Sequence, residues 1–217
     1  MCRCRGNLPN QANAGSAGEP VQKRVMILPL GAEIIRSAQL SRALKHDQLA
    51  YTPRPMAYPQ VSIETDQGTI VVELWNDVAP KHAENFLKLA ASGYYDTTGF
   101  HRILPNFVIQ GGCNRGDGTG GPGWTVKAEF NDRKHEKGVL SMARSGHPDS
   151  AGSQFFICLS RDGCTHLDKQ YTAFGKVITG MEVVDKIAAI PVNRESGSPL
   201  GTPPKMTKVR EVTTANA

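Results

Sequence analysis

From Val61 onward the chain is a series of short apolar runs separated by glycine-rich turns, and this spacing strongly limits the folds open to it. The runs recur roughly every 8 to 12 residues, which is typical of an antiparallel β-sandwich or barrel. The pattern alone does not choose between these two architectures. Beyond the first two, we expect runs at 103–110, 138–143, 153–158, 173–178 and 205–213.

The first two runs predict a β-hairpin. Residues 61–65 and 70–74 alternate apolar and other side chains, as a half-buried strand does, and Gln67-Gly68 supplies the turn between them.

Two segments have helical periodicity. The first starts at Pro80, whose missing N–H costs nothing in a first turn, and stops at Gly93. The second spans 181–190 and ends before Pro191.

Residues 1–59 differ from the rest in composition, being rich in Ala, Gly, Pro, Asn, Gln and Arg. We interpret them as a largely disordered N-terminal extension, and residues 60–217 as one domain. One hypothesis places the biological start at Met56.

Bulk properties exclude several classes of protein. The net charge of +5 comes from scattered Lys and Arg, without a basic run interleaved with aromatic residues, so we expect no dedicated nucleic-acid binding. We expect no membrane span, because no run approaches the roughly 18 apolar residues needed. Five cysteines without repeated spacing argue against a secreted disulfide framework and favour the cytoplasm.

Familiar catalytic motifs do not explain the chain. The sequence lacks a phosphate-binding G-x-x-x-x-G-K-[ST], and Gly116 to Gly121 does not open a helix. Ser153 lacks the G-x-S-x-G elbow of serine hydrolases. His101, His147 and His166 lie in different segments without zinc-ligand spacing, so we expect no metal and no cofactor.

A distinctive cluster remains: FHRILPNFVIQGG at 100–112, Ser141-Met142-Ala143, and GSQFF at 152–156. With these motifs the chain resembles the cyclophilin-type peptidyl-prolyl cis/trans isomerases, specifically single-domain, bacterial-like members with an N-terminal extension. The resemblance covers about Val61 to Thr213. It implies a mainly β fold, a closed eight-stranded antiparallel β-barrel capped by two α-helices, with a substrate groove on its outer face.

The implied reaction is rotation about Xaa-Pro bonds, which must lose amide resonance worth about 18 to 20 kcal/mol. A fixed guanidinium can stabilise the twisted amide, whose nitrogen becomes basic as conjugation is lost. Arg102 matches the family's catalytic arginine, and Gln110 matches the glutamine that braces it. With Phe107, these are the predicted catalytic residues.

The proline ring needs an apolar socket, and the resemblance places Phe107, Val108, Phe156 and Leu167 there. We expect Phe155 to face the opposite way, because neighbours on a strand alternate sides. The remaining positions predicted to bind substrate are Ala143, Arg144, Gln154, His166 and Tyr171.

Four of these positions depart from the best-known members. Arg144 replaces an asparagine, Tyr171 a histidine and Val108 a methionine. His166 stands where cyclosporin-sensitive members have tryptophan, so we expect weak cyclosporin binding.

The expected partners are proline-containing peptides and unfolded or folding client proteins, met by a monomer. Two alternatives remain at this point: a proline-peptide binding module with little turnover, and a scaffold tethered through residues 1–59.

Overall fold

The structure is a computed structural model that describes residues 57–212. The predicted N-terminal extension lies almost entirely outside these residues. Strands β1 (Gln60–Thr65) and β2 (Gly68–Leu74) form the predicted hairpin. Thr65 pairs with Gly68, so the two-residue turn falls at Asp66-Gln67, one residue earlier than the sequence predicts.

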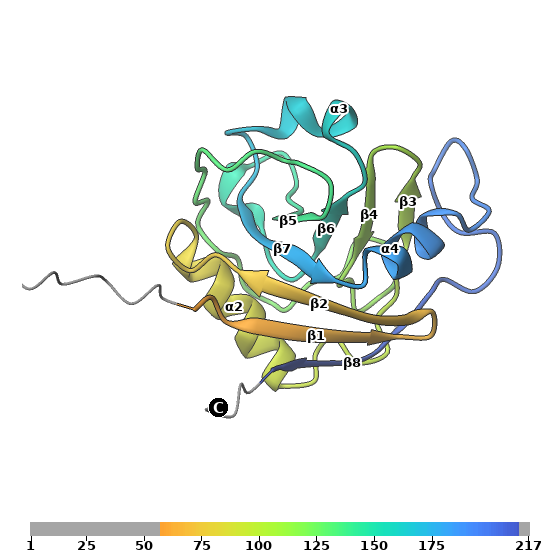
Figure 1. The fold of residues 1–217 in the computed structure, drawn as a ribbon, viewed down its shortest axis with the longest axis horizontal. Helices are drawn as coiled ribbons and strands as arrows, with labels where there is room; N and C mark the ends of the chain where they lie inside the picture. The colour runs from red at the N-terminus through yellow and green to blue at the C-terminus, as the bar shows by residue number, and fades with distance from the viewer. Residues whose placement is uncertain (1–56, 213–217) are drawn as a thin grey trace, which may run out of the picture. The chain divides into compact units, whose positions relative to one another are not determined.

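Eight antiparallel strands form one curled sheet in the order β3-β4-β6-β5-β7-β2-β1-β8 (Figure 1). The six strands that follow the hairpin are β3 (Arg102–Leu104), β4 (Val108–Gly111), β5 (Val139–Met142), β6 (Phe155–Cys158), β7 (Ala173–Thr179) and β8 (Met206–Glu211). The fold is therefore mainly β.

The expected closed barrel is not observed, because the end strands β3 and β8 are not ladder partners. Near these strands the chain is joined by a single bridge between Gly99 and Lys205. Two prolines, Pro203 and Pro204, come directly before this bridge, and a proline has no N–H to donate to a neighbouring strand. The ladder therefore cannot extend beyond them.

The run predicted at 103–110 is in fact two strands, β3 and β4. Leu104 accepts the backbone N–H of Phe107 across a turn in which Asn106 has a positive φ of 62°. Pro and Asn are both favoured in turns, so the pair Pro105-Asn106 is the sequence feature that could have predicted this hairpin.

Two helices lie at the predicted places: α2 (Pro80–Ala91) packs against β7 and β8, and α4 (Met181–Ala188) packs against β2 and β4. A short helix that the sequence did not indicate, α3 (Arg161–Cys164), precedes a 3₁₀ turn at Thr165–Leu167. A second 3₁₀ turn spans Pro148–Ser150.

The start of α2 is capped by a residue distant in sequence. Glu129 accepts the backbone N–H groups of Lys81 and His82 at 3.2 and 3.0 Å. No acidic residue lies in the first turn of the helix itself. Glu129 therefore supplies both the acceptor and the negative charge that a helix N-terminus favours.

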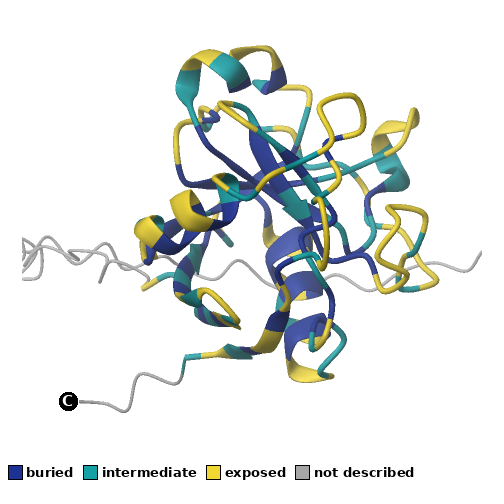
Figure 2. Ribbon diagram, turned by 90° about the vertical axis from the view of Figure 1, so that its right-hand side faces the viewer, coloured by how far each residue is buried: buried dark blue, intermediate teal, exposed yellow. Residues whose placement is uncertain are grey.

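Buried side chains from the strands and the helices α2 and α4 meet in one main core inside the curled sheet (Figure 2). Phe86 of α2 contacts the rings of Tyr95, Phe155 and Phe174, with centroids 5.0 to 5.5 Å apart.

Among residues 57–212, no helix is both long and apolar enough to cross a membrane.

Candidate active site

The strand register brings two of the three predicted catalytic residues, Arg102 and Gln110, into one row with Phe156 and Ser141. Arg102 on β3 pairs with Gln110 on β4, Gln110 pairs with Phe156 on β6, and Phe156 pairs with Ser141 on β5. Because cross-strand partners point to the same face of a sheet, these four side chains lie side by side.

The pleat separates the site from the core. Phe155 and Ile109 belong to the main core, whereas their neighbours Phe156 and Val108 belong to a second apolar cluster. The predicted opposite orientation of Phe155 and Phe156 is thus confirmed. The second cluster forms the floor of a groove on the outer face.

This groove has a volume of about 430 Å³. Val108, Phe156 and Leu167 are at most 5 % exposed and give it an apolar base. The predicted site residues that line it are Arg102, Phe107, Val108, Gln110, Ala143, Arg144, Phe156, His166, Leu167 and Tyr171. Gln170 also lines the groove and was not predicted, since nothing in the sequence sets it apart from other surface glutamines.

A chain of hydrogen bonds runs along one side of the groove. Arg102 Nη1 donates to Gln110 Oε1 at 3.4 Å, and Gln110 Nε2 donates to Gln154 Oε1 at 3.1 Å. Gln154 Nε2 in turn donates to the carbonyl oxygens of Gly118 and Gly120, both at 2.8 Å. The arginine is therefore tied through two glutamines to a backbone loop.

Glycine is required where the chain leaves β4. Gly112 has a φ of 81°, which side chains other than glycine rarely adopt, and an added Cβ would lie 2.5 Å from the carbonyl oxygen of Ser153. The glycines that close the 100–112 motif thus allow the strand to turn tightly beside Gln154.

Aromatic contacts shape the two walls of the groove. The rings of Phe107 and His166 lie 5.3 Å apart, and those of Phe156 and Tyr171 meet edge-on at 5.8 Å. His166 is exposed at the rim, where it continues the wall formed by Phe107.

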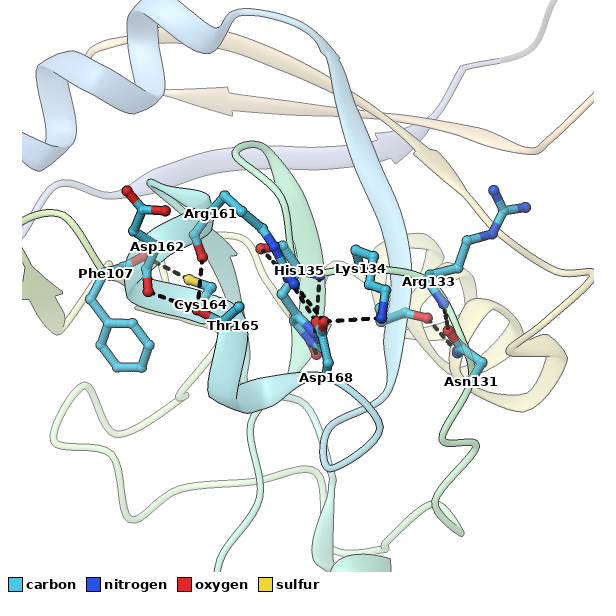
Figure 3. A network of polar contacts seen from close by, with 12 residues as sticks. Phe107, Asn131, Arg133, Lys134, His135, Arg161, Asp162, Cys164, Thr165 and Asp168 are labelled. Atoms are coloured by element: carbon cyan, nitrogen blue, oxygen red, sulfur yellow. Dashed lines mark hydrogen bonds and ion pairs between the residues drawn. The ribbon is translucent and has the colours of Figure 1, made fainter.

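A polar network supports this floor from behind (Figure 3). Asp168 Oδ1 accepts the backbone N–H of His135 at 2.9 Å and contacts its Nδ1 at 3.1 Å, while Arg161 donates to both carboxylate oxygens. The His135 ring stacks on Phe156 with a centroid distance of 6.3 Å. The network thus fixes a residue under the floor, although no local pattern in the sequence pointed to His135 or Asp168.

The protonation of this network follows from its contacts. The Arg161 guanidinium holds the pKa of Asp168 far below its usual range, so Asp168 is a carboxylate and only accepts hydrogen bonds. Burial lowers the pKa of His135. The imidazole is therefore neutral with its proton on Nδ1, and its Nε2 accepts from Ser141 Oγ at 2.9 Å.

The backbone of Phe107 is also held in place. Its carbonyl oxygen accepts the N–H of Leu159 at 2.8 Å and the thiol of Cys164 at 3.3 Å, the latter visible in Figure 3. Both Phe107 and the 3₁₀ turn after Cys164 contribute to the groove, so this contact ties Phe107 to the segment that leads into that turn.

A second hollow of about 470 Å³ adjoins the groove and shares Gln110, Ala143 and Arg144 with it. The last predicted residue, Gln154, lines this second hollow. The loop 118–125 forms its other side. Among residues 57–212, no three His, Cys, Asp or Glu side chains are grouped as a metal site.

Comparison with known proteins agrees with this geometry. The sequence model of the family described as "Cyclophilin type peptidyl-prolyl cis-trans isomerase/CLD" matches residues 60–211. A peptidyl-prolyl cis-trans isomerase of Helicobacter pylori is 44 % identical over 148 residues, covering 66 % of this chain and 85 % of the relative. Peptidyl-prolyl cis-trans isomerase B of Bacillus subtilis is 46 % identical over 132 residues, covering 60 % and 90 %.

Among solved structures, a cyclophilin-type peptidyl-prolyl cis-trans isomerase of Cryptosporidium parvum superposes with a TM-score of 0.68 at 35 % identity, covering 72 % of this chain and 98 % of that one. The same protein was also solved in the presence of the dipeptide Ala-Pro, and that structure superposes with a TM-score of 0.66.

The curled sheet and its outer groove define a β-rich enzyme that acts on peptides. The chain belongs to the cyclophilin-type peptidyl-prolyl cis-trans isomerases, a family that binds proline-containing peptides. Its activity is the acceleration of cis–trans rotation about Xaa-Pro bonds, and nothing in the comparisons favours a binding module without turnover.

Proposed function

We propose that the groove bounded by Arg102, Phe107 and Tyr171 is where this isomerisation takes place. The observation that carries the proposal is the juxtaposition of an apolar socket with a guanidinium that, among residues 57–212, forms a side-chain hydrogen bond only with Gln110. The socket suits a proline ring, and the guanidinium suits the amide that precedes the ring.

In this proposal the ring rests on Phe156 and Val108, with Phe107 and Leu167 at its sides. Holding the ring fixed means that rotation is made by the residue before proline. Apolar burial of the ring binds the planar and the twisted forms almost equally, so it positions the substrate without by itself lowering the barrier.

Arg102 is the group that binds the twisted form of the amide more strongly than the planar form. As the amide twists, its nitrogen loses conjugation and becomes a hydrogen-bond acceptor, and a guanidinium N–H beside it binds the twisted form more strongly than the planar one. Each tenfold gain in rate needs about 1.36 kcal/mol of such differential binding. Gln110 keeps Arg102 in this orientation, and Gln154 holds Gln110.

The test is the rate of isomerisation of a short Ala-Pro peptide, measured by NMR exchange, for the unchanged chain and for Arg102→Ala. We expect a loss of about a hundredfold, as for removal of one preorganised donor. Arg194→Ala is the matched control, because Arg194 is exposed and does not line the groove. An unchanged rate in a folded Arg102→Ala protein would falsify the proposed role.

We further propose that the substrates are proline-containing segments of folding proteins and that the chain acts as a monomer in the cytoplasm. The three cysteines among residues 57–212 are free thiols, which supports a reducing compartment. Light scattering tests the monomer, and fractionation of the source cells tests the location.

We also propose that cyclosporin binds weakly. His166 offers a smaller and more polar surface at the rim than an indole does, so less apolar contact is available. Inhibition of His166→Trp at lower cyclosporin concentrations than the unchanged chain is the expected result. Equal inhibition of both proteins would contradict it.

A further inference from the structure

Arg144 occupies the boundary between the two hollows, and it is one of only three residues that line both. It lies two residues after the end of β5, next to Ala143, whose N–H donates to the carbonyl oxygen of Gln154 at 2.9 Å. The position of Arg144 is therefore fixed by the same sheet that positions the proposed catalytic row.

The side chain of Arg144 is held by neutral groups. Its guanidinium lies 4.5 Å from the centre of the Tyr171 ring. Its Nε and Nη2 both donate to the carbonyl oxygen of Gln170 at 3.3 Å, and Nη1 donates to that of Ser145 at 3.0 Å. These contacts fix the guanidinium but leave its positive charge uncompensated.

No acidic side chain balances this charge. The ion pairs of arginine among residues 57–212 involve Arg133, Arg161 and Arg210, but neither Arg102 nor Arg144. Neither hollow is lined by Asp or Glu. Two guanidinium groups thus face a hollowed surface without a counter-ion, an arrangement that concentrates positive potential where a peptide would bind.

The placement of Arg144 relative to a substrate follows from the proposed function, on which this inference rests. With the ring in the socket and the amide at Arg102, the residue before proline continues from the amide past Gln110. Gln110 is shared by both hollows, and so is Arg144. The side chain of the residue before proline therefore passes the guanidinium of Arg144.

We propose that Arg144 selects substrates with an acidic residue, Asp or Glu, directly before the proline. Its hydrogen bonds within residues 57–212 occupy at most four of its five N–H groups, so at least one is left for a carboxylate. Because its partners already hold the side chain, little further conformational entropy is lost when the carboxylate binds. Arg102 remains hydrogen-bonded to the amide, and Arg144 binds the acidic side chain of the residue before proline.

The experiment compares kcat/KM for the peptides Ala-Glu-Pro-Phe, Ala-Gln-Pro-Phe and Ala-Lys-Pro-Phe at low salt. Gln matches Glu in size but carries no charge, so the Glu/Gln ratio isolates the ionic contribution. We expect a ratio of about five in the unchanged chain, the size typical of a partly exposed ion pair. The Lys peptide should be turned over more slowly than the Gln peptide.

Two measurements assign the preference to Arg144. The Glu/Gln ratio should fall to about one in Arg144→Gln, but stay at about five in Arg194→Gln, which removes the same charge outside the groove. In the unchanged chain the ratio should also fall as salt is raised from about 0.01 M to 1 M, because the Debye length shortens from roughly 30 to 3 Å.

The outcomes separate this inference from the proposed function. A ratio of one in an active, unchanged chain overturns the role of Arg144 and leaves the isomerase site intact. A Glu/Gln ratio that stays at about five in Arg144→Gln overturns the role of Arg144 as well, since another group must then bind the acidic side chain. Failure to turn over any of the three peptides would instead count against the proposed site itself.

Discussion

Removal of the Asp168 carboxylate is the sharpest test of how the groove is built. Asp168 lies behind the groove and directly follows Leu167, which forms part of the apolar base. In Asp168→Ala, the backbone N–H and Nδ1–H of His135 lose the acceptor that they share. Because His135 is fully buried, water cannot replace that acceptor without rearrangement.

The expected loss of stability follows from the number of buried donors that lose their acceptor. Each buried donor left without a partner costs about 1 to 3 kcal/mol, so the two donors of His135 together cost about 2 to 6 kcal/mol. The side chain of Arg161 is 35 % exposed and can turn to solvent, so its lost ion pair adds little to this loss. We therefore expect the free energy of unfolding to fall by about 2 to 6 kcal/mol.

Urea denaturation at pH 7 measures this difference, with Asp132→Ala as the control. Asp132 also forms an ion pair, with Lys169 at 2.9 Å, but its side chain is 90 % exposed. The control should leave the free energy of unfolding nearly unchanged. If Asp168→Ala proved no more destabilising than Asp132→Ala, the reasoning about the buried donors of His135 would be refuted.

Two further predictions concern the N-terminus of α2 and the buried histidines. Glu129→Gln should lower the free energy of unfolding by about 1 to 2 kcal/mol, because the helix loses its capping carboxylate; Glu84→Gln, an exposed change on the same helix, should have little effect. Stability should also fall as the pH drops below about 6.5, because burial lowers the pKa of three histidines and the unfolded chain therefore takes up protons first. These histidines are His82, His101 and His135. Unfolding curves at pH 8, 7, 6 and 5 measure the second effect, and equal stability from pH 8 to 5 would contradict it. The contribution of Asp168, whose pKa is lowered, should be lost only below about pH 4.

Local patterns were informative where a local cause governs the structure. Pro80 and Gly93 marked the ends of α2 closely, because helix ends depend on which residues have or lack a suitable φ and N–H. Alternation predicted the hairpin at 61–74 and the opposite orientations of Phe155 and Phe156. The turn residues Pro105-Asn106 lie inside an apolar run, and the run by itself predicted one strand where the structure has two.

Sequence patterns did not predict contacts between residues that lie far apart in the chain. Asp168 meets His135 across 33 residues, and Glu129 caps a helix that starts 49 residues before it. Such contacts depend on how strands are ordered in the sheet, and the spacing of residues carries no record of that order. For the same reason, the sequence did not reveal that the end strands β3 and β8 do not pair with each other.

The motif at 100–112 by itself determined the chemistry, since it contains the guanidinium, the aromatic side chain and the glutamine that the reaction needs. Only the tertiary structure decided what these residues face. The register of β3, β4, β6 and β5 aligns Arg102, Gln110 and Phe156, and the return of the chain at 166–171 closes the groove over them. The physical reason is that side-chain type is a property of one residue, whereas a cavity, its charge and its hydrogen bonds arise only when distant segments pack together.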